Sequence, residues 1–259
     1  MKERIDVVLV DRGLVESRTK AQWLIMNGYV VINGKKITKP GKRVDDSLEI
    51  HLLKKFPYVG RGGLKLESAL KFFSISVKDK VCADIGASVG GFTDCLIKSG
   101  ARKVYAIDTA IDLLHPLLRI EKMKKIVIPM VGVDARNKIE MEEKIDVCTI
   151  DTTFTSLREI LPNVKNFLRK KGIIIALIKP LFETQFQKEK KFKIIRDSRI
   201  LSNILKELIE WSIKNNIFPY GIKSSPLLGK GGSIEFLIYY KIHKKDNKFD
   251  YKKAIKEIL

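Results

Sequence analysis

The chain has 259 residues, which is room for one large domain and one small one. Hydrophobic residues make up 45% of it, enough for a sizeable core, and 50 Lys and Arg against 30 Asp and Glu give a net charge of +20. A surface this positive indicates a polyanionic partner, either nucleic acid or an anionic membrane, although a general use of lysine would explain part of the charge.

The chain shows no sign of membrane insertion, secretion or metal binding. Its longest apolar run, Ile173 to Ile178, is far too short to span a bilayer, so no membrane partner is expected. The three cysteines are odd in number and include no CxxC pair, so we expect neither a disulfide framework nor a metal site. Residues 1–6 carry acids and no long apolar segment, unlike a signal peptide. These features favour a cytoplasmic protein, and no obligate protein partner is evident.

The first fifty residues predict a small module of helices and strands. A helix is expected over residues 4–14 and a second over 18–26, with Ser17 as its N-cap. Residues 29–37 then predict a β-hairpin around the turn Asn33-Gly34, and another short strand follows.

This module contains the motifs Ser17-Arg18-Thr19-Lys20-Ala21, Gly28-Tyr29-Val30 with Ile32-Asn33-Gly34, and Lys39-Pro40-Gly41. They resemble the S4 RNA-binding domain. The resemblance implies an α+β S4-like domain over residues 1–54 whose basic side chains follow RNA phosphates, contacts that position a protein without reading sequence. The candidate RNA-binding residues are Arg4, Arg18, Lys20, Lys35 and Lys36, with Arg61 further along. The alternative is a packing module with a solvated basic face.

Beyond the module, the chain alternates between apolar runs and helical patterns. Residues 55–63 are rich in glycine and charge and are expected to be an interdomain linker. A helix follows with Lys65 in its first turn, where the helix dipole disfavours a cation, which hints at a task for this lysine. The alternation predicts an α/β domain over residues 64–243 with a doubly wound, mainly parallel sheet. An added basic, partly helical tail is expected over 244–259.

The stretch from Asp84 to Thr93 combines a strand end, a glycine-rich turn and a helix start. Glycines let the backbone approach a ligand, and a helix N-terminus offers free N–H groups. The next strand ends at Asp108, an acid well placed to hold a ribose. We therefore predict a nucleoside-bearing cofactor, S-adenosylmethionine. Its predicted contacts are Asp84, Gly86, Ala87, Ser88, Gly90, Gly91, Phe92, Asp108 and Asp134.

Other interpretations of this turn remain open. It lacks the second glycine of the dinucleotide fingerprint, but Gly86-x-Ser88-x-Gly90 matches the nucleophile elbow of hydrolases. A hydrolase would also need a histidine after an acid, and of the three histidines His243 stands in the basic tail. We therefore favour the methyl donor. The interpretation that this is a glycine-rich turn with no ligand is less favoured, because both neighbouring strands end in an acid, Asp84 and Asp108.

Several stretches occur in a specific order: Tyr58-Val59-Gly60-Arg61-Gly62-Gly63-Leu64-Lys65, Asp84-Ile85-Gly86-Ala87-Ser88-Val89-Gly90-Gly91, Ile178-Lys179-Pro180, and Ser225-Pro226 before Glu235. Over nearly the whole chain they resemble the TlyA family of S4-containing ribosomal RNA methyltransferases, which belong with the FtsJ-like ribose 2′-O-methyltransferases. The resemblance implies a Rossmann-like methyltransferase domain with a catalytic tetrad. Its members would be Lys65, Asp151, Lys179 and Glu235.

The implied reaction moves a methyl group from S-adenosylmethionine to the ribose 2′-hydroxyl of a cytidine in 16S or 23S ribosomal RNA, within ribosomal subunits. That hydroxyl is a very weak acid, so Lys179 beside it would act as a base or as a cation that stabilises the oxyanion. The two carboxylates would orient the lysines. Two alternatives stay open: a membrane-lytic protein, since the family is often labelled haemolysin, and a non-catalytic RNA-binding assembly factor.

Overall fold

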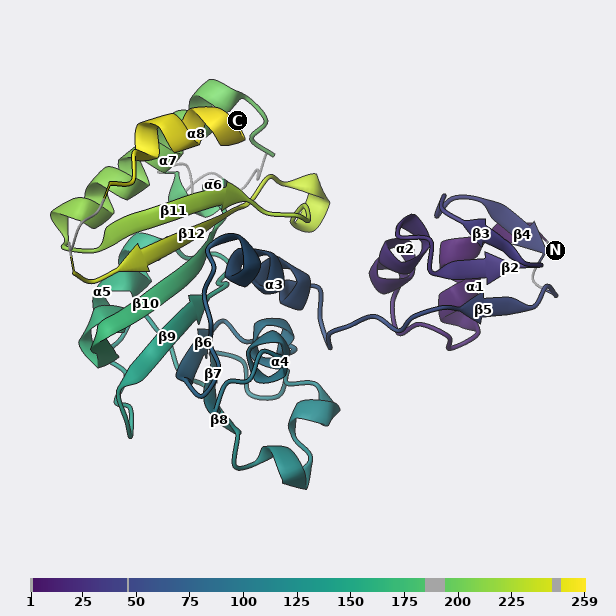
Figure 1. The fold of residues 1–259 in the computed structure, drawn as a ribbon, viewed down its shortest axis with the longest axis horizontal. Helices are drawn as coiled ribbons and strands as arrows, with labels where there is room; N and C mark the ends of the chain where they lie inside the picture. The colour runs from purple at the N-terminus through teal and green to yellow at the C-terminus, as the bar shows by residue number, and fades with distance from the viewer. Residues whose placement is uncertain (1, 46, 185–193, 244–247) are drawn as a thin grey trace. The chain divides into compact units, whose positions relative to one another are not determined.

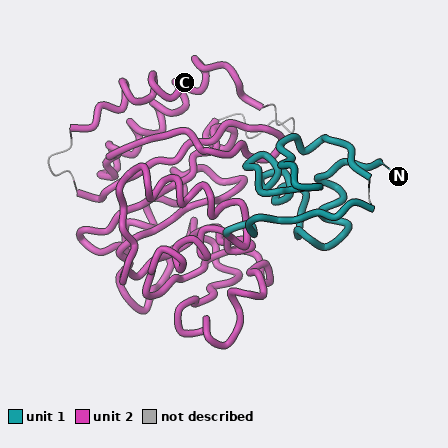
Figure 2. The backbone as a smooth tube through the Cα atoms, turned by 45° about the vertical axis from the view of Figure 1, so that its right-hand side comes forward, with its two compact units in different colours: residues 1–57 teal, residues 58–259 magenta. Residues whose placement is uncertain are grey.

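The computed structural model describes residues 2–45, 47–184, 194–243 and 248–259, which form two compact units, residues 1–57 and 58–259 (Figure 2). The expected linker over 55–63 is therefore wrong in its second half. Tyr58, Val59 and Gly60 are buried in the second unit, and the Val59 amide donates to the Asp94 carboxylate at 2.8 Å. Gly60 lies against the Val89 side chain and the Gly91 backbone, and the Tyr58 side chain packs against Gly63, so this stretch belongs to the second unit.

The first unit has the predicted helices and hairpin. Its elements are β1 (Lys2–Arg4), α1 (Ile5–Asp11), α2 (Arg18–Met26), β2 (Val30–Ile32), β3 (Lys35–Ile37), β4 (Arg43–Asp45) and β5 (Ile50–Leu52). Strands β3, β2 and β5 form an antiparallel sheet, and β1 pairs with β4. Ser17 caps α2 as expected, and the hairpin turn places Asn33 and Gly34 at positive φ. The first helix is shorter than predicted at both ends: Arg4 belongs to β1, and the helix stops at Asp11, two residues before Gly13 at positive φ.

The second unit is built on a seven-stranded sheet in the order β11-β12-β10-β9-β6-β7-β8 (Figure 1). Strands β10, β9, β6, β7 and β8 are parallel, and β12 runs antiparallel between β10 and β11. This confirms the predicted mainly parallel sheet. The strands are β6 (Val81–Ile85), β7 (Lys103–Asp108), β8 (Val127–Val131), β9 (Ile145–Ile150), β10 (Leu168–Ile178), β11 (Phe218–Ser224) and β12 (Phe236–Lys241).

Helices cover both faces of this sheet, so its strands are buried on both sides. They are α3 (Gly62–Phe72), α4 (Gly91–Lys98), α5 (Leu157–Phe167), α6 (Pro180–Glu183), α7 (Ser198–Lys214) and α8 (Tyr251–Ile258). Helices α3 and α4 pack together on one face (Figure 1). Helices α5, α7 and α8 share the main core with Val81, Ala83 and Ile85 of β6, which point to the other face.

The expected basic tail over 244–259 is partly helical, as predicted, but its described helix packs into the domain and is not an added segment. Residues 251–258 form α8, capped by the Asp250 carboxylate, which accepts from the Lys252 and Lys253 amides at 3.0 and 3.1 Å. Ile255 is fully buried against the main core, and the Ser224 hydroxyl of β11 donates to the Ile258 carbonyl. The segment is thus an amphipathic helix of the domain. Residues 244–247 lie outside the described residues.

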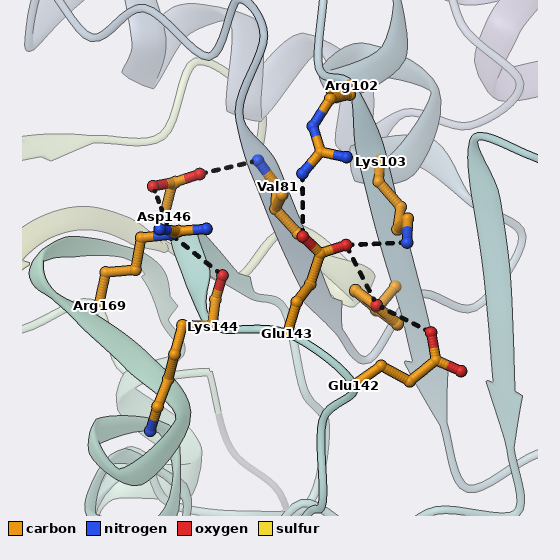
Figure 3. A network of polar contacts seen from close by, with 9 residues as sticks. Val81, Arg102, Lys103, Glu142, Glu143, Lys144, Asp146 and Arg169 are labelled. Carbon is orange, nitrogen blue, oxygen red and sulfur yellow. Dashed lines mark hydrogen bonds and ion pairs between the residues drawn. The ribbon is translucent and has the colours of Figure 1, made fainter.

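The amino ends of the parallel strands are held together by charge pairs (Figure 3). Asp146 accepts from the Val81 amide at 3.0 Å and pairs with Arg169 at 3.1 Å. Glu143 pairs with Arg102 at 2.9 Å and Lys103 at 2.8 Å. These contacts join the starts of β6, β7 and β9, and they leave the carboxyl edge as the side to search for a ligand site.

Within the described ranges, no helix combines the length and the apolar character that crossing a membrane would need.

The packing of α8 can be tested by stability. We expect Ile255→Ala to lower the free energy of unfolding by about 2–5 kcal/mol, because it leaves a cavity in the main core. Lys256→Ala, an exposed change on the same turn, should cost less than about 0.5 kcal/mol. Urea unfolding of the full chain measures both. Equal, small effects would show that α8 does not belong to the core.

Candidate active site

A cavity of about 680 Å³ opens at the carboxyl edge of the sheet. The glycine turn after β6 forms one wall, and residues after β7, β8, β9 and β10 form the others. Seven of the nine predicted cofactor contacts line it: Gly86, Ala87, Ser88, Gly91, Phe92, Asp108 and Asp134. The cavity is therefore where the strand-end rule places a ligand of a doubly wound sheet.

The glycine turn is shaped by close backbone approach. Gly86 has φ +78°, and a Cβ there would lie 2.4 Å from the Asp151 carbonyl oxygen, so no other residue fits. Ser88 also has positive φ, and Gly90 at φ +91° stands directly before α4. The turn thus leads the chain across the end of β9 and starts a helix whose first N–H groups lie by the cavity.

Asp108 and Asp134 present carboxylates to this cavity. Asp108 accepts from the Ser88 amide at 2.8 Å and from the Ala110 amide at 2.9 Å, one bond to each oxygen. Its remaining lone pairs can accept from a ribose diol. Asp134 is paired with Arg136, whose hydrogen bonds lower the pKa of the Asp134 carboxyl. The volume, the two acids and the glycine turn all fit an adenosine-bearing cofactor.

Asp84, in contrast, is wrong as a cofactor contact. It is fully buried beneath α4, and its carboxylate accepts from the Thr93 hydroxyl at 2.6 Å and the Thr149 hydroxyl at 2.9 Å. It points to the α4 face because side chains alternate along β6. Burial raises the pKa of Asp84 to about 6, against the two threonine hydrogen bonds. Gly90 does not line the cavity either, since it packs against Leu118.

The four tetrad positions form two short ion pairs. Lys179 Nζ lies 2.6 Å from Asp151 Oδ1, and Lys65 Nζ lies 2.5 Å from Glu235 Oε2. All four side chains are largely buried, with between 5% and 22% of their surface exposed. Lys179 and Asp151 line the cavity, whereas Lys65 and Glu235 do not.

The strand register explains why these pairs are neighbours. Ile178, the last residue of β10, is the partner of Phe236, the first of β12. The next position on each strand holds Lys179 and Glu235, so antiparallel pairing brings them to the same end of the sheet. Asp151 follows β9, the parallel neighbour of β10. Lys65 reaches Glu235 from α3, which the sequence places 170 residues earlier.

Sequence reasoning missed Phe154, which also lines the cavity. It has φ +62°, unusual for a bulky residue, and 72% of it is exposed. Its ring centroid lies 5.3 Å from that of Phe182. The available signal was an aromatic residue four positions after Ile150, the last residue of β9.

The predicted RNA-binding residues of the first unit differ in how exposed their side chains are. Lys35 and Lys36 are exposed on β3. Arg4 and Arg18 are half exposed, and both bind the buried Asp6 carboxylate. Burial would raise the pKa of Asp6, but hydrogen bonds from Arg4, Gln22 and Arg18 outweigh it and hold the pKa well below its usual range.

Lys20 is wrong as an exposed RNA contact. It is buried, pairs with Glu16 and lies over the Phe56 ring at 5.5 Å. It occupies the buried side of α2 beside Ala21 and Leu24, which a helical pattern alone does not reveal for a long amphipathic side chain. Arg61, in the second unit, is exposed and lines the cavity.

The titration of Asp84 gives a test. Its raised pKa means that the folded protein binds more protons than the unfolded chain between pH about 4 and about 6. Stability is therefore lost as the pH rises through that window, by on the order of 3 kcal/mol. We expect Asp84→Asn to abolish this step, measured by urea unfolding from pH 4 to 7. Asp112→Asn, at an exposed carboxylate, should keep it, and parallel curves for wild type and Asp84→Asn would contradict the assignment.

Comparison with known proteins agrees with this architecture. The model of the FtsJ-like methyltransferase family matches residues 58–242, and that of the S4 domain matches residues 3–50. YqxC of Bacillus subtilis is 40% identical over 241 residues, covering 92% of this chain and 85% of that protein. The 16S/23S rRNA (cytidine-2'-O)-methyltransferase TlyA of Mycobacterium tuberculosis is 30% identical, covering 92% and 89%.

Hemolysin A of Brachyspira hyodysenteriae is 36% identical, covering 92% of this chain and 99% of that protein. A solved structure from Streptococcus thermophilus that carries a hemolysin name has a TM-score of 0.72 and 37% identity, covering 99% of this chain and 94% of the other. The chain therefore belongs to the FtsJ-like methyltransferase family, whose methyl donor is S-adenosylmethionine, and carries an S4 domain before its methyltransferase domain.

Proposed function

We propose that this protein methylates the ribose 2′-hydroxyl of a cytidine in ribosomal RNA. The observation that carries the proposal is the Lys179 ammonium on the cavity wall, held by Asp151 at 2.6 Å beside the glycine turn. The Mycobacterium tuberculosis relative is named for the same reaction on 16S and 23S rRNA. The S4 domain and the net charge of +20 suit an RNA substrate.

The cofactor supplies a sulfonium methyl group that is already activated for transfer. Gly86 to Ser88 would hold it, and Asp108 would accept hydrogen bonds from its ribose hydroxyls. The protein's own task is then to orient the RNA hydroxyl oxygen and to favour its anionic character. Lys179 donates from its ammonium to that oxygen, which stabilises the developing negative charge while the hydroxyl proton passes to solvent water. Asp151 holds this ammonium in place, and the Lys65–Glu235 pair fixes the neighbouring strand end.

The S4 domain has a separate role in this proposal. Lys35 and Lys36, both exposed on β3, bind RNA phosphates and hold the substrate without reading its sequence. Specificity for one nucleotide then depends on the methyltransferase cavity.

Transfer of labelled methyl groups to purified ribosomal subunits tests the reaction, with mass spectrometry to identify the modified nucleotide. We expect wild-type protein to label a cytidine ribose. Lys179→Ala should lower kcat by about 10²-fold to 10³-fold, because it removes a donor to the oxyanion. Lys171→Ala changes an exposed lysine at the other end of the same strand and should leave kcat unchanged. Base methylation, or an active Lys179→Ala variant, would contradict the proposal.

Phe154 gives a second test. Its exposed ring at the cavity can stack on the base of a nucleotide turned out of its RNA helix, a contact worth about 1–3 kcal/mol. We expect Phe154→Ala to lower kcat/KM for RNA by about tenfold to a hundredfold, while Phe154→Trp keeps most of it. Binding of S-adenosylmethionine, measured by calorimetry, should not change. Phe72→Ala, at a phenylalanine that is 59% exposed at the end of α3, serves as the control.

A further inference from the structure

Glu183 is a buried carboxylate that neither the tetrad nor the cofactor contacts include. It is the last residue of α6, four positions after Lys179, and its side chain is only 2% exposed. Its carboxylate accepts from the Ser156 hydroxyl at 2.6 Å, the Leu157 amide at 2.8 Å and the Arg158 guanidinium at 2.9 Å. All three donors lie at the start of α5.

These bonds join the two loops that carry the reacting groups. The first loop follows β9, begins at Asp151 and ends at the start of α5. The second follows β10, begins at Lys179, contains the short helix α6 and reaches Glu183. The same two loops meet at the Lys179–Asp151 ion pair. They meet again at the tilted rings of Phe154 and Phe182, whose centroids lie 5.3 Å apart. The two loops therefore touch at three places, and the bonds of Glu183 are the contact furthest along the chain from the ion pair.

A role in helix capping does not by itself explain this carboxylate. Ser156 caps α5 by accepting from the Arg158 amide at 3.1 Å, and Glu183 caps only the Leu157 amide. Its bonds from the Ser156 hydroxyl and the Arg158 guanidinium are not capping bonds. Burying a carboxylate is costly unless it is fully bonded. Burial raises the pKa of Glu183, while the bonds from Leu157 and Ser156 and the charge of Arg158 oppose that shift. A buried carboxylate that accepts two of its three donors from side chains, beyond the one amide that it caps, indicates a second task.

We propose that Glu183 is a positioning residue, which fixes the loop after β9 against the loop after β10 so that Asp151 holds the Lys179 ammonium in its catalytic place. The proposal rests on the proposed methyl transfer to RNA, because kcat is one of its two readouts. Glu183 acts through the start of α5 and touches neither substrate nor cofactor.

The test compares full-length Glu183→Ala, Glu183→Gln and a matched control, Glu159→Ala, which removes an exposed carboxylate from the same turn of α5. We expect Glu183→Ala to lower kcat by about 10²-fold, the effect of a displacement of about 1 Å at a catalytic group. Dissociation constants for S-adenosylmethionine and for ribosomal RNA should stay at wild-type values. Glu183→Gln keeps an acceptor for the Leu157 amide, so its kcat should lie between those of Glu183→Ala and wild type. The kcat of Glu159→Ala should equal that of wild type.

A second readout does not require methyl transfer. The rate at which a small amine-reactive acetylating reagent modifies each lysine is measured by mass spectrometry, well below the melting temperature. We expect acetylation of Lys179 to become several-fold faster in Glu183→Ala, towards its rate in Asp151→Asn. Lys65, paired with Glu235 on other elements, should keep its rate.

Two results would overturn the proposal. One is a wild-type kcat and an unchanged Lys179 rate in Glu183→Ala, even if its melting temperature falls, since the residue would then serve stability alone. The other is equal acceleration at Lys65 and Lys179, which would show general loosening. If wild-type protein methylates no RNA, the proposed function fails, and the two acetylation rates still decide whether Glu183 positions Lys179.

Discussion

The ion pair between Lys179 and Asp151 depends on strand order more than on any local feature. β9 and β10 are parallel neighbours, so their carboxyl ends deliver Asp151 and Lys179 to one point, 2.6 Å apart. β12 enters antiparallel, so its first residue meets the last of β10 and brings Glu235 to the same edge. A different order, with another strand between β10 and β12, would move the two lysine–carboxylate pairs apart by a further strand spacing of about 4.8 Å.

The glycine turn and the start of α3 are fitted to each other by the absence of side chains. A Cβ on Gly62 would lie 3.0 Å from the Phe92 ring, and one on Gly91 would lie 3.1 Å from the Gly63 amide. This backbone contact holds the segment before Lys65 against the cofactor turn. It thereby links the lysine that pairs with Glu235 to the cavity wall where we propose that the methyl donor binds.

The sequence was sufficient for features with a local signature. The hairpin turn at Asn33-Gly34, the Ser17 cap, and the strand ends at Asp108 and just before Asp151 were all predictable from neighbouring residues. What failed was burial that depends on distant partners. Lys20 is covered by Phe56, and Asp84 by Thr93 and Thr149. The tail is held by Ile255 in a core assembled from other elements. Composition marks such residues as polar or basic but cannot show what covers them.

Charge is divided unequally between the site and the rest of the molecule. The two lysines and two carboxylates of the tetrad cancel in formal charge, so the whole surplus of +20 lies outside it. Exposed residues such as Lys35 and Lys36 would attract a polyanion, through electrostatic forces that are long-ranged and weakened by salt. A balanced site does not need to attract phosphate. Its ammonium groups act over a few ångströms, in a largely buried setting where salt screens them little. The positions and orientations of these groups therefore matter more than the net charge of the site. This is why fixing the loops that carry Asp151 and Lys179 matters as much as the presence of the two residues.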